Sequence, residues 1–130
     1  MTTKLLVDTH IWIWFRIGSP RLSKSEIELI LSHQKSNSLF LSAISIWETA
    51  MLQKSGRIEI HEPIHQWVNR AIQGFKVVPI TTEIALESVV LELNHKDPAD
   101  RFILATSRVM GLRILSHDQV IAKIYSSVER

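Results

Sequence analysis

The chain has 130 residues, of which 45% are hydrophobic and 22% charged, and its net charge is +2. This length and balance predict a single globular domain spanning residues 1–130, and they exclude an intrinsically disordered chain. The absence of cysteine excludes disulfides and thiolate metal ligands. Because no apolar run approaches ~20 residues and no signal peptide is evident, we expect a cytoplasmic protein with no membrane partner.

Strand-like and helix-like segments alternate along the chain. Short apolar runs between turn residues predict buried strands at residues 4–7, 39–41, 75–78 and 113–115. Periodic apolar residues predict helices at residues 11–18, 23–31, 45–56, 63–74, 82–93, 97–111 and 119–124. This order predicts crossover connections, and therefore an α/β fold of three layers, α/β/α, around a parallel sheet of four or five strands. Whether the tail after residue 124 adds a fifth strand stays open.

Two helix starts have specific sequence signals. Ser23 followed by Glu26 has the spacing of a capping box. Asp97 followed by Pro98 places a capping side chain before a proline at the first helical position.

In the 82–93 segment, helical spacing directs four apolar side chains toward the core, namely Ile84, Ala85, Val89 and Leu93.

Acidic residues follow predicted strands or open predicted helices at five positions: Asp8, Glu48, Asp97, Asp100 and Asp118. The carboxyl ends of parallel strands meet at one edge of a sheet, where open α/β folds bind their ligands. Crowded carboxylates repel one another unless a cation lies among them. The set therefore predicts a divalent-metal site of oxygen ligands, suited to Mg²⁺ or Mn²⁺ and to phosphodiester hydrolysis by activated water.

Taken singly, most of these acids also have a structural explanation. The explanations are a capping box between Ser45 and Glu48, a helix cap at Asp97, the positive helix end at Asp100 and a turn at Asp118. Asp8 is hardest to explain in this way, because it follows a strand and precedes an apolar helix. Ser116 either orients a carboxylate or a water, or is simply a serine at the end of a strand.

Four blocks, in this order and spacing, resemble PIN-domain ribonucleases, and most closely the VapC-type toxins of bacterial toxin–antitoxin pairs. The blocks are Val7-Asp8-Thr9-His10, Ser45-Ile46-Trp47-Glu48, His95-Lys96-Asp97-Pro98-Ala99-Asp100-Arg101 and Leu115-Ser116-His117-Asp118. The resemblance implies a PIN-like domain and an endoribonuclease that depends on Mg²⁺ or Mn²⁺. It assigns catalysis and metal binding to Asp8, Glu48, Asp100 and Asp118, with Asp97 and Ser116 as accessory residues. The family often has Thr where Ser116 stands, and the hydroxyl is kept.

The same resemblance implies partners. These are an RNA substrate, a homodimeric second copy and a cognate antitoxin that wraps an apolar groove and sends an Arg into the acidic pocket. We expect the groove to be lined by Ile11, Trp12, Trp14 and Phe15.

Residues 61–65 match the H-E-x-x-H pattern of zinc peptidases. That pattern needs both histidines on one face of a continuous helix. Pro63 disfavours such a helix, so a surface loop is the better interpretation.

Aromatic and basic residues near the acids are open to two interpretations. The four tryptophans could stack on bases, but their helical spacing beside Ile and Phe favours packing. His10 and His117 adjoin Asp8 and Asp118, so each could contact a phosphate or serve as a neutral hydrogen-bonding group. For Arg101 a structural pairing is the preferred interpretation.

Other functions fit the sequence less well. A haloacid-dehalogenase-type phosphatase needs a second Asp two residues after the first, where this chain has His10. A receiver domain needs an Asp after the third strand, and residues 79–81 supply none. Another metal-dependent phosphoesterase, or a catalytically degenerate PIN-like domain that binds RNA or a partner, remains the alternative.

Overall fold

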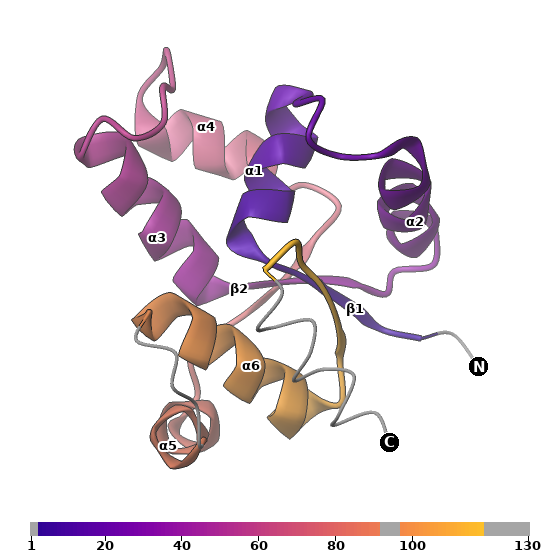
Figure 1. Cartoon of the computed structure of the whole chain (residues 1–130), viewed down its shortest axis with the longest axis vertical. Helices are drawn as coiled ribbons and strands as arrows, with labels where there is room; N and C mark the ends of the chain where they lie inside the picture. Colours follow the sequence, from indigo (N-terminus) through magenta and orange to yellow (C-terminus); the bar gives the residue numbers. More distant parts are fainter. Residues whose placement is uncertain (1–2, 92–96, 119–130) are drawn as a thin grey trace.

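The computed structural model describes residues 3–91 and 97–118 (Figure 1). In chain order its elements are β1 (Leu5–Val7), α1 (Thr9–Ile17), α2 (Lys24–Lys35), β2 (Leu39–Ser42), α3 (Ala43–Lys54), α4 (Ile64–Ala71), β3 (Lys76–Val78), α5 (Thr82–Val90), α6 (Pro98–Met110) and β4 (Arg113–Leu115). The predicted helix at 119–124, the end of the predicted 82–93 helix and any fifth strand lie outside the described residues.

The sheet has four parallel strands in the order β3-β2-β1-β4. The first strand, β1, pairs with both β2 and β4, so that Leu5 lies opposite Leu39 on one side and Arg113 on the other. The chain moves outward from β1 through β2 to β3 and then returns to the other side of β1. The strand order therefore reverses between β1 and β4, the position at which parallel sheets form a ligand crevice.

Helices cover both faces of the sheet, which confirms the three-layer prediction. In Figure 1, α1, α2 and α4 lie on one side of the strands and α5 and α6 lie on the other. Alternate strand residues point to opposite faces, so Leu5 and Val7 join one buried cluster while Leu6 joins a second. Because both faces are covered, every residue of β1 and β2 is buried.

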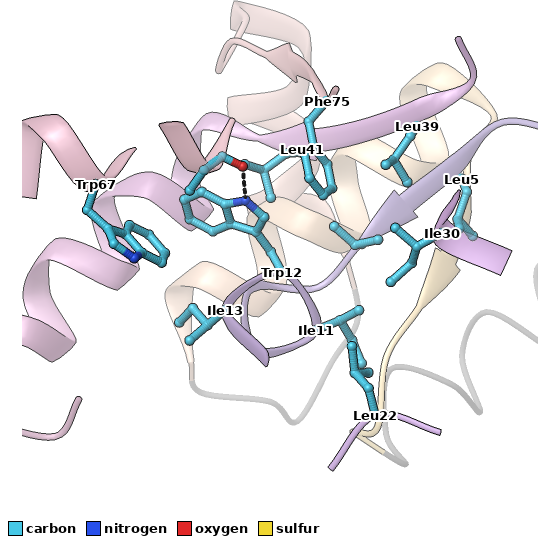
Figure 2. Close-up of a cluster of buried hydrophobic side chains, with 12 residues drawn as sticks. Leu5, Ile11, Trp12, Ile13, Leu22, Ile30, Leu39, Leu41, Trp67 and Phe75 are labelled. Carbon is cyan, nitrogen blue, oxygen red and sulfur yellow. Dashed lines mark hydrogen bonds between the residues drawn. The ribbon is translucent and has the colours of Figure 1, made fainter. Parts of the chain in front are cut away.

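Trp12 is the largest fully buried side chain in the first cluster (Figure 2). It is 0% exposed, and its Nε1 donates a hydrogen bond of 2.9 Å to the carbonyl oxygen of Ala71 at the end of α4. Its ring meets that of Trp67 edge-on, with 5.3 Å between ring centroids. This contact fixes α4 against α1.

The predicted antitoxin groove was wrong for two of its four residues. Ile11 and Trp12 are both 0% exposed, so neither can line a groove open to a partner. Helical spacing correctly indicated an apolar face of α1, but α2 and α4 already cover that face.

Most helix boundaries follow their sequence signals. Ser23 and Glu26 form the predicted capping box, and Asp97 caps α6 ahead of Pro98. Gly111 ends α6 with a φ of 67°, a conformation that glycine adopts without steric cost. The start of α3 differs, because Ser42 at the end of β2 is its cap and Ser45 lies inside the helix.

One predicted core position was wrong in α5. Val89 is 77% exposed, whereas Ile84 and Ser88 are the residues of this helix that turn inward. α5 is an outer helix that packs chiefly on α6, so only a narrow stripe of it is covered.

The zinc-peptidase pattern does not form a site. α4 begins at Ile64, with Pro63 as its cap, so His61 precedes the helix that contains His65. Glu62 forms an ion pair of 2.7 Å with Arg70. The two histidines therefore do not share a helical face, as Pro63 predicted.

None of the helices within residues 3–91 and 97–118 combines the length and the apolar character that crossing a membrane requires.

Replacing Trp12 with Ala tests this packing. Loss of a fully buried tryptophan should lower the free energy of unfolding by about 3–5 kcal/mol. Trp47, which is 50% exposed on α3, is the matched control, and its replacement with Ala should cost much less. Urea unfolding of both variants measures the difference, and equal losses would contradict the burial of Trp12.

Candidate active site

All five acids singled out from the sequence line one cavity of about 400 Å³. They include every aspartate of the chain. Asp8 follows β1, Asp118 follows β4, Glu48 comes from α3, and Asp97 and Asp100 come from the start of α6. The cavity thus lies at the carboxyl ends of β1 and β4, beside the reversal of strand order.

Asp8 is held from two sides. It is 6% exposed, and it caps α1, because its Oδ1 accepts a hydrogen bond of 2.6 Å from the backbone N–H of Thr9. Its Oδ2 accepts a hydrogen bond of 2.6 Å from the hydroxyl of Ser116. The Ser116 hydroxyl also accepts from the backbone N–H of Asp118 at 3.0 Å. One serine therefore connects the two acids that follow β1 and β4.

The surroundings of Asp8 disfavour its charge. Burial raises the pKa of the Asp8 carboxyl, and the negative charge of Asp118 raises it further. The hydrogen bonds from Ser116 and Thr9 and the nearby His10 lower this pKa but do not cancel the effect of burial. An ionised Asp8 is consequently destabilised unless positive charge is added to the cavity.

Glu48 gives the clearest indication that the cavity binds a ligand. Its Oε1 is buried and has no hydrogen-bond partner within residues 3–91 and 97–118. Burial raises the pKa of Glu48, the nearby Thr9 hydroxyl lowers it, and the charges of Asp97 and Asp8 raise it. Buried polar atoms are nearly always paired, so an unpaired carboxylate oxygen among other acids suits a bound cation or water.

The capping box between Ser45 and Glu48, the structural alternative for Glu48, does not form. Because α3 starts at Ala43, Glu48 lies in its second turn rather than its first. The Ser45 hydroxyl instead accepts a hydrogen bond of 2.8 Å from the Thr9 hydroxyl. This removes the structural explanation for Glu48 and leaves its placement in the cavity.

The sequence interpretation missed the roles of Thr9 and Ser45. Both are fully buried, and the hydrogen bond between their hydroxyls joins the start of α1, which Asp8 caps, to α3, which contains Glu48. A signal was present, since Ser45 lies three residues before Glu48 and Thr9 adjoins Asp8. Side chains three residues apart share a helix face.

The other acids have structural roles as well as places in the cavity. Asp97 caps α6 by accepting from the backbone N–H of Ala99 at 3.0 Å. Asp100 is 7% exposed in the first turn of α6, where the positive helix end stabilises a carboxylate. At Asp118 the backbone N–H, rather than the carboxylate, forms a turn with the Ser116 hydroxyl. The structural explanations offered for Asp97 and Asp100 thus hold alongside their cavity positions.

Arg101, next to Asp100, binds backbone carbonyl oxygens. Its guanidinium donates to Ser88 at 3.0 Å and to Leu91 at 2.9 Å, at the carboxyl end of α5. A cation is favourable at this negative end of a helix. These contacts are structural, in agreement with the preferred interpretation of Arg101.

The donor set suits a hard divalent cation. Within residues 3–91 and 97–118, no three acidic or histidine side chains already stand as a metal-ligand cluster. In this arrangement Asp8 binds Thr9 and Ser116 instead. The donors available are carboxylate oxygens, which Mg²⁺ and Mn²⁺ prefer, and the unpartnered Oε1 of Glu48 is one of them. The residues therefore fit such an ion.

Comparison with known proteins shows independently which family the chain resembles. The family model described as PIN domain matches residues 5–126. Over 118 residues the chain is 31% identical to "Ribonuclease VapC22" of Mycobacterium tuberculosis (strain ATCC 25618 / H37Rv), covering 90% of this chain and 88% of the relative. A chain in a solved "Toxin-antitoxin complex from Klebsiella pneumoniae" has the same fold, with a TM-score of 0.64 and 24% identity, over 93% of this chain and 92% of that one.

The raised pKa of Glu48 predicts a stability that depends on pH. The folded state binds a proton at Glu48 more tightly than the unfolded state does. Stability therefore falls as pH rises from the ordinary pKa of 4.5 through the raised pKa of the folded state. Replacing Glu48 with Gln should therefore raise the unfolding temperature by a few degrees at neutral pH without divalent metal. Below the ordinary pKa of 4.5, where both states are protonated, this gain should vanish.

Thermal unfolding in the presence of a chelator, measured across pH, checks this prediction. The matched control is Glu28→Gln, an identical change at an exposed position of α2. A Glu48→Gln variant that gains nothing over this control at neutral pH would contradict the assigned electrostatics.

Proposed function

This chain belongs to the PIN-domain family, and from that premise we propose that it is a divalent-metal-dependent endoribonuclease, the toxin of a type II toxin–antitoxin pair. The observation that carries the proposal is the cavity in which five acids converge, one of them with an oxygen, Oε1 of Glu48, that no described residue pairs. The VapC-type relative, a ribonuclease by name, supports RNA as the substrate. The proposed place of action is the cytoplasm.

The proposed metal ligands are Asp8, Glu48, Asp100 and Asp118, with Asp97 as an accessory acid. Mg²⁺ or Mn²⁺ bound there would lower the pKa of a coordinated water and stabilise charge on the departing oxygen. Bound cation would also relieve the repulsion that raises the pKa of Asp8 and Glu48. These acids would then be ionised together at neutral pH.

The protein's own contribution is orientation. Ser116 and the Thr9 N–H fix both oxygens of Asp8, so this ligand need not be ordered when substrate arrives. Oε1 of Glu48 is available to accept a hydrogen bond from the attacking water. Water attacks phosphorus, a new P–O bond forms, and the bond to the 3′-oxygen breaks. The products are a 5′-phosphate and a 3′-hydroxyl.

The antitoxin is proposed to bind a groove different from the one expected from the sequence. α3 and α4 enclose an apolar cavity of about 180 Å³ whose lining includes Ile46, Ala50, Ile64 and Val68. Trp47 and Met51, each 50% exposed, lie beside it on α3. An amphipathic antitoxin segment would cover these side chains. A homodimer is proposed to cover the exposed apolar residues of α5, namely Leu86, Val89 and Val90.

Replacing Asp8 or Asp100 with Asn tests the catalytic assignment. Each variant should cleave RNA at least 100-fold more slowly in Mg²⁺, because a metal-ligating charge is lost. Mg²⁺ or Mn²⁺ should raise the unfolding temperature of the parent but not of these variants. Cleavage-site mapping on total cellular RNA and thermal unfolding supply the two measurements, with Glu28→Gln as the control. Cleavage by Asp8→Asn at the parental rate would sink the assignment.

Co-expression tests the partner assignment. The product of an adjacent gene should co-purify with the chain and suppress both its toxicity and its RNA cleavage. Ala50→Arg, which adds bulk and charge to the α3–α4 cavity, should abolish co-purification while leaving cleavage unchanged. Size-exclusion chromatography of the isolated chain and of Val89→Arg measures the dimer. Unchanged co-purification of Ala50→Arg would exclude this groove, and a monomeric parent would exclude the homodimer.

A further inference from the structure

The acidic cavity has a second part of its lining that the proposed chemistry does not use. His10, Trp14, Arg21 and His117 line the same cavity as the acids, and we call them the aromatic wall. The ring centroid of Trp14 lies 5.7 Å from that of His10 and 5.1 Å from that of His117. The Arg21 Cζ lies 5.4 Å from the Trp14 ring centroid. Trp14 is therefore the centre of the wall.

The four tryptophans do different things in this fold. Trp12 and Trp67 are buried in the core, and Trp47 is half exposed on α3, away from the acidic cavity. Trp14 is partly buried, packs against the first apolar cluster and also lines the cavity. Packing alone does not require an indole ring at the edge of a polar cavity, so Trp14 is the candidate for a base-stacking role.

The ring of Trp14 is held in place. His10 precedes it by one helical turn on α1, so the two side chains share a face. His117 reaches it from the end of β4 and is itself bound through Nε2 to Oε2 of Glu26 at 2.7 Å. A stacking surface that is ordered in advance loses less entropy when a ligand binds.

The charges of the cavity make the aromatic wall the favourable side for a nucleic acid. Five carboxylates repel the phosphates of an RNA strand. Among the described residues that line the cavity, Arg21 alone has a permanent positive charge. A guanidinium over an aromatic ring offers a cation for phosphate directly beside a surface for a base.

We propose that Trp14 and Arg21 form a nucleotide subsite beside the acidic cavity, Trp14 stacking on the base next to the cleaved phosphate and Arg21 binding a phosphate of the same strand. This inference rests on the proposed ribonuclease function and adds to it a substrate contact. His10 and His117 are positioning residues that hold the Trp14 ring. A base can lie on the ring only where it is unpaired, and an aromatic face accepts any base.

Binding to two RNA-like probes separates stacking from phosphate contact. The probes are an oligouridylate and a chain of abasic ribose phosphates of equal length, measured by fluorescence anisotropy in Mg²⁺ with proteins carrying Asp8→Asn to prevent cleavage. Trp14→Leu should weaken oligouridylate binding about tenfold and leave binding of the abasic chain unchanged. Trp14→Phe should restore most of the loss. Arg21→Gln should weaken binding of both probes alike and reduce its salt dependence.

Matched controls lie elsewhere in the fold. Trp47→Leu removes an exposed indole outside the cavity, and Arg113→Gln removes a charge at the start of β4, the opposite end of the sheet from the acids. Neither change should alter binding. The thermal unfolding temperature verifies that each variant is folded, and Trp14→Met, which also lacks an aromatic ring, takes the place of Trp14→Leu if that variant does not fold.

The outcomes separate this inference from the proposed function. Equal affinity of Trp14→Leu and the Trp14 protein for oligouridylate, or an equal loss with both probes, would overturn the stacking role even if the parent cleaves RNA. Stacking-dependent binding by a parent that cleaves no RNA would overturn the ribonuclease and retain a nucleotide-binding subsite. In the parent enzyme Trp14→Leu should raise KM about tenfold with little change in kcat.

Discussion

The parallel pairing of β1 with β4 is the constraint on which the acidic cavity depends. It brings the ends of two strands together across nearly the whole described chain, with Val7 opposite Leu115. The residues that follow each strand then meet, and Ser116 completes the junction by donating to Asp8. α3 and α6 need only deliver Glu48, Asp97 and Asp100 to an edge that this pairing has already defined. The convergence of the acids is therefore a property of the topology, in which chain reversal leaves a crevice beside the central strand.

The cavity concentrates charge at a cost to the folded state. Burial raises the pKa of both Asp8 and Glu48, and each lies close enough to another acid for repulsion to add to the effect. Two buried hydroxyls, those of Thr9 and Ser45, join α1, which Asp8 caps, to α3, which contains Glu48. The burial of the apolar clusters on both faces of the sheet stabilises the fold and offsets this repulsion. The arrangement to which a cation and a substrate are proposed to bind is therefore already assembled.

The sequence predicted the order of elements, the strand positions to within a residue and the meeting of the five acids at one edge of the sheet. These features could be predicted because parallel-sheet patterning and acids at strand ends are local signals. It did not predict which neighbours would cover a face. Trp12 and Trp14 look alike in sequence, yet α4 buries Trp12 while Trp14 reaches the cavity. Val89 continues the apolar pattern of α5, but nothing within the described residues covers it. Ser45 and Glu48 have capping-box spacing, but the true cap, Ser42, belongs to the preceding strand. Each miss reflects tertiary context that a single segment does not contain.

The hydrogen bond between Ser116 and Asp8 joins residues 108 positions apart in sequence. Contacts between such distant residues form late, because the entropy of closing a long loop must be overcome first. During synthesis, β4 cannot pair with β1 until it has left the ribosome, long after the segments with Asp8 and Glu48 have emerged. A nascent chain thus has no assembled acidic cavity while it is still near the translation machinery and its RNA. The order of synthesis delays activity until almost the entire domain is available to fold.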